Sequence, residues 1–264
     1  MESVVLHKRS SFAIMTDVVM ALLVRELKTR FGSSRLGYFW ALAEPILQAS
    51  VMAVIFTVLQ RTSVNGIEIA PFLLVAVVPF KFFAKLLPQL TVAAQSNQAL
   101  LAYRQVTPID PLLTRFIIEV ATLILVFVII GLIMSWLGFN MWPQDLLALI
   151  LVLGVLAWLG FGIGLCLCVA VIYWKDTTKL LSFVMAPMFF ISGIFFAATM
   201  IPEPFWKYFT WNPIFHALEL SRDAYFKAYE TPVGDLAFIA GCALFFNALG
   251  LMLYQVNKHK FVSS

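Results

Sequence analysis

Charge is scarce in this sequence. Asp, Glu, Lys and Arg make up only 12% of its 264 residues, whereas hydrophobic residues make up 62%. Soluble domains are about 25% charged and about 45–50% apolar, because their surface must face water. The composition therefore excludes a soluble protein and predicts an all-α integral membrane protein with room for about six helical spans.

Cysteine and histidine are also rare. Three cysteines lie in apolar runs, where we expect packing residues rather than a disulfide framework or a metal site: Cys166, Cys168 and Cys242. His216, Glu219 and Asp223 can share one helix face, as an acid–base or metal cluster would. The two other histidines lie near the chain ends, and a zinc or catalytic site needs more converging ligands. We predict no catalytic and no metal site.

The sequence has no G-x-x-x-x-G-K-[ST] phosphate loop. We therefore expect no ATP hydrolysis by this chain, so ATP-driven work would come from another subunit. A gradient-driven carrier would instead need carboxylates near the bilayer centre, and Glu119 is the best candidate. Glu119 lies four residues after Arg115, however, and an ion pair between them near the inner interface is the simpler interpretation.

Six apolar segments are candidate spans. They cover residues 38–60, 70–93, 112–137, 144–173, 180–200 and 235–256. We expect one transmembrane domain, with a tail and interface helix at 1–35, the six spans within 36–256 and a second tail at 257–264.

Lys and Arg are distributed unevenly over the segments that connect these spans. Of the 18, 12 fall on one side and 4 on the other, and Lys81 and Lys85 lie within a span. Because these residues are in excess on cytoplasmic loops, we expect both termini in the cytoplasm. The net charge of +4 then reflects topology and anionic headgroups, and gives no reason to expect nucleic acid.

Two cytoplasmic segments are predicted to be helical without crossing the membrane. Residues 16–32, capped by Thr16 or an earlier Ser and ended by Gly32, carry separate apolar and charged stripes, as an interface helix does. Residues 97–103 form a short helix that ends before Pro108. The second segment could dock a soluble partner or be a mere connection.

Residues 201–232 are too aromatic for an ordinary loop and too charged for a lipid-exposed span. Two short helices, broken at Asn212-Pro213, could dip into the outer interface and return. A belt of aromatic anchors at the interface is the alternative.

Gly160 and Gly164 form a small-xxx-small pair in the fourth span. Such a pair lets two helix backbones approach closely. We expect a close helix contact there, within one subunit or between two.

The stretch PFKFFAKLLP at 79–88 places Lys81 and Lys85 on one face of an apolar span. Cations at membrane depth are costly and mark polar cavities or pathways. Lys85 can extend to the inner headgroups. Lys81 lies near mid-membrane, so we expect it to face a polar cavity or a channel.

Three stretches carry a family resemblance. RELKTRFGSSRLGYFWALAEPI (25–46) combines an Arg-rich amphipathic helix with Leu36-Gly37, Phe39-Trp40 and Glu44-Pro45. SGIFFAATMIP (192–202) precedes WNPIFHALELSRDAYF (211–226). In this order, and with six spans, they resemble type-2 ABC exporter permeases of the branch that exports capsular polysaccharide and O-antigen.

The resemblance implies a homodimeric inner-membrane permease that binds two copies of a cytoplasmic ATPase subunit, which would hold the ATP and Mg²⁺. It implies export of a lipid-linked acidic capsular polysaccharide, received by periplasmic and outer-membrane export proteins. It also implies that the coupling helix meeting the ATPase contains Asn97, Leu100, Leu101, Tyr103 and Arg104.

Such a polymer needs aromatic platforms for its sugar faces and cations for its charge. The aromatic candidates are Tyr38, Trp40, Phe80, Phe82 and Phe83 near the inner half, and Trp206, Trp211 and Tyr225 near the exit; the cationic ones are Arg25, Lys28, Lys81 and Lys85. Ordinary packing or interface anchoring is the alternative for each aromatic. Two other functions stay open: a type-2 permease for O-antigen, teichoic acid, lipid or drug, and a membrane enzyme acting on lipid-linked sugars.

Overall fold

The described chain is built almost wholly from helices. A computed structural model describes residues 10–32, 37–58, 63–64, 66–103, 105–139 and 141–263. The helices are α1 (Ser11–Gly32), α2 (Gly37–Val58), α3 (Ile69–Thr91), α4 (Gln98–Leu101), α5 (Ile109–Trp136), α6 (Leu146–Tyr173), α7 (Thr177–Ile191), α8 (Pro213–Tyr225), α9 (Leu236–Asn257) and α10 (Lys260–Ser263). Short 3-10 helices cover Gln95–Asn97 (η1), Ala198–Met200 (η2) and Glu203–Tyr208 (η3), and β1 (Ser63–Val64) pairs antiparallel with β2 (Ile67–Glu68).

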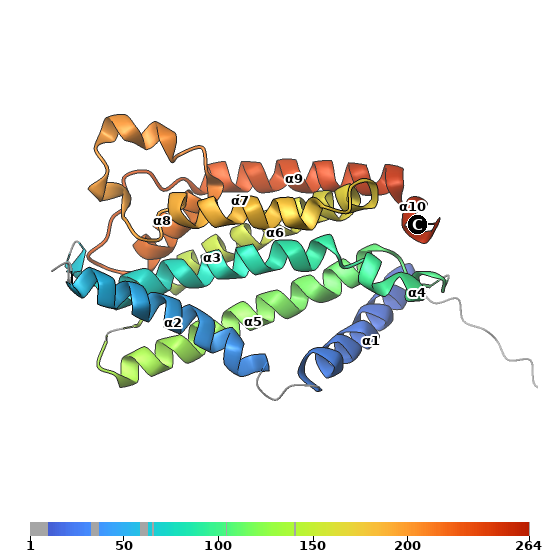
Figure 1. The fold of residues 1–264 in the computed structure, drawn as a ribbon, viewed down its shortest axis with the longest axis horizontal. Coiled ribbons are helices and arrows are strands. Elements are labelled where there is room, and N and C mark those ends of the chain that lie inside the picture. Colours follow the sequence, from blue (N-terminus) through green and yellow to red (C-terminus); the bar gives the residue numbers. More distant parts are fainter. Residues whose placement is uncertain are drawn as a thin grey trace, which may run out of the picture.

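Among the described residues, four helices are long and apolar enough to cross a membrane, namely α3, α5, α6 and α9. Both α2 and α7 contact α3 and run along the same bundle (Figure 1), but α7 has only 15 residues and the apolar stretch of α2 covers Ile46–Phe56. The predicted helical membrane class is therefore confirmed, and four of the six expected spans meet the length and hydropathy of a span.

The fifth apolar segment ends earlier than predicted, because α7 stops at Ile191 rather than continuing to residue 200. Gly193 has a φ of +77°, a left-handed conformation that glycine adopts freely and that ends helices. After this turn, the carbonyl oxygens of Ile194 and Phe196 accept hydrogen bonds from Arg222 instead of from a helical neighbour. The sequence 180–200 is apolar throughout its centre, so its hydropathy did not reveal the turn.

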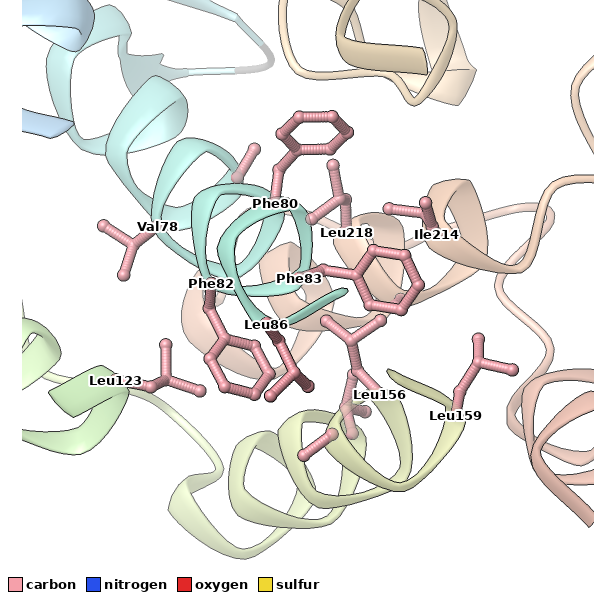
Figure 2. Packing of buried hydrophobic residues seen from close by; sticks show 14 of the residues in the cluster. Val78, Phe80, Phe82, Phe83, Leu86, Leu123, Leu156, Leu159, Ile214 and Leu218 are labelled. Atoms are coloured by element: carbon pink, nitrogen blue, oxygen red, sulfur yellow. The ribbon is translucent and has the colours of Figure 1, made fainter. Parts of the chain in front are cut away.

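Helix α3 lies at the centre of the bundle. Most of its side chains are buried, and it contacts α2, α5, α6, α7 and α8. Figure 2 shows Phe83 of α3 among side chains of its neighbours, including Leu156 and Leu159 of α6 and Leu218 of α8. Phe80 and Phe83, expected near a polymer path, lie instead inside this core. A helix that is apolar on nearly every face is stable only when neighbours cover it.

Glycines bring α6 close to its neighbours. A Cβ on Gly160 would lie 2.7 Å from Cδ2 of Leu86, and one on Gly164 would lie 2.7 Å from Cβ of Leu90, both on α3. A Cβ on Gly162 would lie 2.6 Å from the backbone nitrogen of Asn247 on α9. The two predicted glycines therefore lie against α3, and a third one between them lies against α9.

Different short helices lie at the two ends of the bundle. The beginning of α1, the short helix α4 and the C-terminal α10 lie together at one end, whereas η3 lies at the other (Figure 1).

Ser10 caps α1 by accepting a hydrogen bond from the backbone N–H of Ala13, 3.2 Å away. The helix thus begins before Thr16, at the earlier Ser that the sequence allowed, and ends at Gly32 as predicted.

Candidate functional site

A polar pocket opens between α2, α3 and α5. Its volume is about 400 Å³, and we call it the lysine pocket. Four charged side chains line it together with the indole of Trp40: Glu44 from α2, Lys81 and Lys85 from α3, and Glu119 from α5. Among the polar sequence candidates, the structure thus brings together Trp40, Lys81, Lys85 and Glu119.

The spacing of the lysines explains why both reach this pocket. Lys81 and Lys85 are four residues apart, so they lie one helical turn apart on the same face of α3. The residues between them on other faces, Phe82 and Phe83, are buried. The lysines therefore lie on a side of α3 that is not enclosed by the core.

Two ion pairs cross the pocket from α3. Lys81 Nζ lies 2.6 Å from Glu44 Oε1, and Lys85 Nζ lies 3.5 Å from Glu119 Oε2. The Glu44 side chain is 64% exposed, whereas that of Glu119 is 2% exposed. The pairs balance the charge of the pocket, which lowers the cost of charges at membrane depth. Lys81 lines this pocket, and its expected place on a substrate path stays a prediction.

Glu119 and Arg115 each have a partner on another helix, which the simple i, i+4 interpretation did not include. Arg115 Nε donates to Glu26 Oε1 of α1 at 3.1 Å, and Arg115 also donates to the backbone oxygen of Gln89 at 2.8 Å. Arg25 donates to the side-chain oxygen of Asn97. Glu26 thus attaches α1 to α5, and Arg25 attaches α1 to η1, just before α4. Arg25 points to Asn97 rather than into the lysine pocket.

The attachment of α1 leads to a prediction. Exchanging the charges of one pair, as Glu26→Arg with Arg115→Glu, should restore much of the function that either single change removes, because the largely buried ion pair is re-formed. Each single change places like charges together and should lower the thermal unfolding midpoint of the purified protein. A swap no better than the singles would mean that Arg115 acts through Gln89 alone.

The predicted coupling residues differ in exposure. Asn97 and Leu101 are buried, Leu100 is half-buried and Tyr103 is 66% exposed. Asn97 Nδ2 donates to the backbone oxygen of Ala93 at 2.8 Å, so its side chain is used within the chain. Among the described residues that are predicted to couple to an ATPase, Tyr103 has the most exposed side chain. Arg104 lies outside the described residues.

The aromatic residues expected near an exit mostly make internal contacts. Trp206 Nε1 donates to the backbone oxygen of Ile201 at 2.9 Å, and the Tyr225 hydroxyl donates to that of Met141 at 2.6 Å. Trp211 is exposed, and so is Lys28 of α1. The side chain of Tyr38 lies outside the described residues. None of these described residues lines the lysine pocket.

The predicted break at Asn212-Pro213 is confirmed, because Asn212 caps α8 by accepting from the N–H of Ile214 at 2.9 Å. His216 is used at both ring nitrogens: Nε2 donates to the oxygen of Thr210 at 2.7 Å, and Nδ1 accepts from the N–H of Asp235 at 3.2 Å. These contacts leave no ring nitrogen for acid–base work. In the described ranges, no three His, Cys, Asp or Glu side chains gather as a metal site would require.

Arg222 is the centre of a buried network on α8. Its guanidinium donates to Glu219 Oε1 at 3.0 Å and lies 3.8 Å from the ring centroid of Phe72. Glu219 accepts a second hydrogen bond from the hydroxyl of Tyr229. Burial, and then the charge of Glu219, raise the pKa of the Tyr229 hydroxyl above its usual range, so it stays protonated and donates. Glu219 is therefore a structural residue rather than an acid–base catalyst.

Glu44 lines the pocket, although the sequence patterns do not select it as a site residue. It belongs to the Glu44-Pro45 motif, which gives no indication that Lys81 is its partner. A signal was available, because charges at membrane depth usually pair with each other, and Glu44 and Lys81 lie in adjacent predicted spans.

Known proteins resemble the chain along nearly its whole length. It is 33% identical to the polysialic acid transport protein KpsM of Escherichia coli, over 97% of this chain and 99% of that protein. It is 28% identical to the capsule polysaccharide export inner-membrane protein CtrC of Neisseria meningitidis serogroup A, over 93% and 94%. It is 23% identical to the O-antigen export system permease protein RfbA of Klebsiella pneumoniae, over 93% of each. The family model described as ABC-2 type transporter matches residues 17–226, and the chain belongs to that family.

Proposed function

We propose that this chain is the inner-membrane permease of an exporter for a lipid-linked, acidic capsular polysaccharide, with ATP hydrolysis on a separate subunit. One observation carries the proposal: the similarity to the polysialic acid transport protein runs through almost all of both chains at 33% identity. The absence of a phosphate loop from the sequence is consistent with a separate ATPase.

The proposed topology is a single permease domain over 1–264, with α2, α3, α5, α6, α7 and α9 as six spans and both termini in the cytoplasm. The common position of α1, α4 and α10 at one end of the bundle supports an even number of crossings (Figure 1). The excess of Lys and Arg on the same segments supports a cytoplasmic location of that end. Helices η3 and α8 then form the re-entrant segment at the outer interface.

The proposed assembly is a homodimer with two ATPase subunits, which hold the ATP and Mg²⁺, and with periplasmic and outer-membrane proteins that receive the polymer. Tyr103 supports docking of the ATPase at the α4 end, because an exposed aromatic residue is a common anchor in protein interfaces. Tyr173 and Trp174, at the end of α6, are exposed as well. Lys81, Lys85 and Trp40 would line part of the path for the anionic substrate.

The experiment is co-purification of the tagged chain with its ATPase, combined with measurement of surface polysaccharide in cells that lack the native copy. We expect the wild-type chain to retain the ATPase and restore surface polymer, and Tyr103→Ala to lose most of the bound ATPase while still inserting. Phe205→Ala, which changes an exposed aromatic residue of η3, serves as the matched control. Restored export of O-antigen alone would favour the other substrate class, and a chain that never binds an ATPase would contradict the proposal.

A further inference from the structure

The two ion pairs of the lysine pocket differ in how readily they can open. Glu119 is almost fully buried, so separating it from Lys85 would leave a carboxylate without solvent. Glu44 is mostly exposed at the surface of the chain, so it can leave Lys81 without becoming enclosed by protein. The Lys81–Glu44 pair is therefore the one that a competing anion can replace.

We propose that Lys81 binds the phosphate of a membrane lipid, and that Glu44 occupies the place of this phosphate while the pocket is empty. The inference rests on the proposed function and deepens it, because it assigns a binding group to the lipid end of a lipid-linked substrate. Lys85 and Glu119 remain paired and form the second charged wall of the site.

Charge balance supports a phosphodiester as the ligand. In the empty pocket the two lysines are matched by two carboxylates. When Glu44 swings away, Lys81 and Lys85 face Glu119 alone, which leaves one positive charge. A phosphodiester carries one negative charge and restores neutrality, which is the state that a site at membrane depth favours. The proposal requires that the displaced Glu44 carboxylate reach water or headgroups from the exposed face of α2.

Size and lining favour a lipid over the polymer itself. A volume of about 400 Å³ lies near the lower end of the range for small-ligand sites, so it suits a headgroup rather than a sugar chain. Val78, Phe82 and Val126 give the pocket an apolar wall beside its charges, where an acyl chain can pack. The exposed indole of Trp40 adds an N–H donor.

The test uses the purified full-length protein in detergent, titrated with dioctanoyl phosphatidylglycerol and with dioctanoylglycerol, which has the same tails and no phosphate. Binding is measured by calorimetry. We expect the phosphate lipid to bind about tenfold or more tightly than the neutral lipid, because only the phosphate can form a charge-assisted hydrogen bond with Lys81. Equal affinities would overturn the inference. Inorganic phosphate competing as well as the lipid would overturn the lipid source.

Two variants separate anion binding from a structural ion pair. Lys81→Gln should weaken binding of the phosphate lipid about tenfold, whereas Glu44→Gln should tighten it, because the internal competitor is gone. A purely structural pair predicts the same direction for both variants, since each breaks the same contact, and that result would overturn the inference. Lys81→Arg keeps a cation and should retain binding.

Lys179→Gln is the matched control, because Lys179 is an exposed lysine in another ion pair, 2.7 Å from Asp176. It should leave lipid binding unchanged, and an equal loss in this variant would also count against a specific role of Lys81. Export is not part of this measurement. A chain that exports polymer but does not distinguish the two lipids would contradict this inference alone, whereas one that distinguishes them without ATP-dependent export would contradict the proposed function.

Discussion

Replacing Arg222 by Met is expected to prevent most of the chain from reaching a folded state in the membrane. The guanidinium is fully buried, contacts Glu219, and donates to the backbone oxygens of Ile194 and Phe196 at 2.8 and 3.1 Å. Methionine fills similar space but leaves a buried carboxylate and two buried carbonyl groups without their donor. Breaking a buried pair in this way costs about 3–5 kcal/mol, which is a large part of the stability of a typical domain.

The measurement is the yield of monodisperse protein after solubilisation, together with its thermal unfolding midpoint. Lys207→Met is the matched control, because Lys207 is an exposed cation on η3 in the same external segment. Adding Glu219→Gln to Arg222→Met should recover part of the loss, because it removes the uncompensated charge. A wild-type midpoint for Arg222→Met alone would contradict the structural role assigned to the network.

Local sequence patterns predicted the helices because their causes are local. Long apolar runs located α3, α5, α6 and α9 to within a few residues, since length and hydropathy decide which helices can cross a membrane. Asn212-Pro213 located the start of α8, because an Asn cap followed by Pro at the first helical position is a local signal.

Contacts between distant segments could not be predicted in the same way. Lys81 lies 37 residues from Glu44, and Arg115 lies 89 residues from Glu26, so no local pattern joins the members of either pair. The end of α7 depends on a glycine turn whose carbonyls are bound by Arg222, 28 residues beyond Ile194. The spacing of Lys81 and Lys85 predicted the part of the candidate site that α3 contributes. The positions of Glu44 and Glu119 beside these lysines depend on how α2 and α5 pack against α3.

Gly162→Ala is expected to destabilise the protein more than alanine at Gly154, Gly160 or Gly164, the other glycines of α6. The added Cβ would lie 2.6 Å from the backbone nitrogen of Asn247 and 2.8 Å from the backbone carbon of Phe246. Backbone atoms cannot rotate away as a side chain can, so α9 must shift as a whole. The shift would also strain the hydrogen bond that Asn247 Nδ2 donates to the backbone oxygen of Trp158 at 2.8 Å. Overpacking of this kind costs about 1–3 kcal/mol.

Gly154→Ala is the control that isolates this contact, and both variants are compared by their thermal unfolding midpoints in one detergent. Gly154 lies on the same helix, and a Cβ there would meet nothing within 4 Å. Both substitutions gain about 1 kcal/mol of helix propensity from replacing glycine. Because that gain is common to both, the difference between their midpoints reports only the approach of α9 to α6. Equal midpoints would mean that the two helices separate at little cost, and that Gly162 is not needed for close packing.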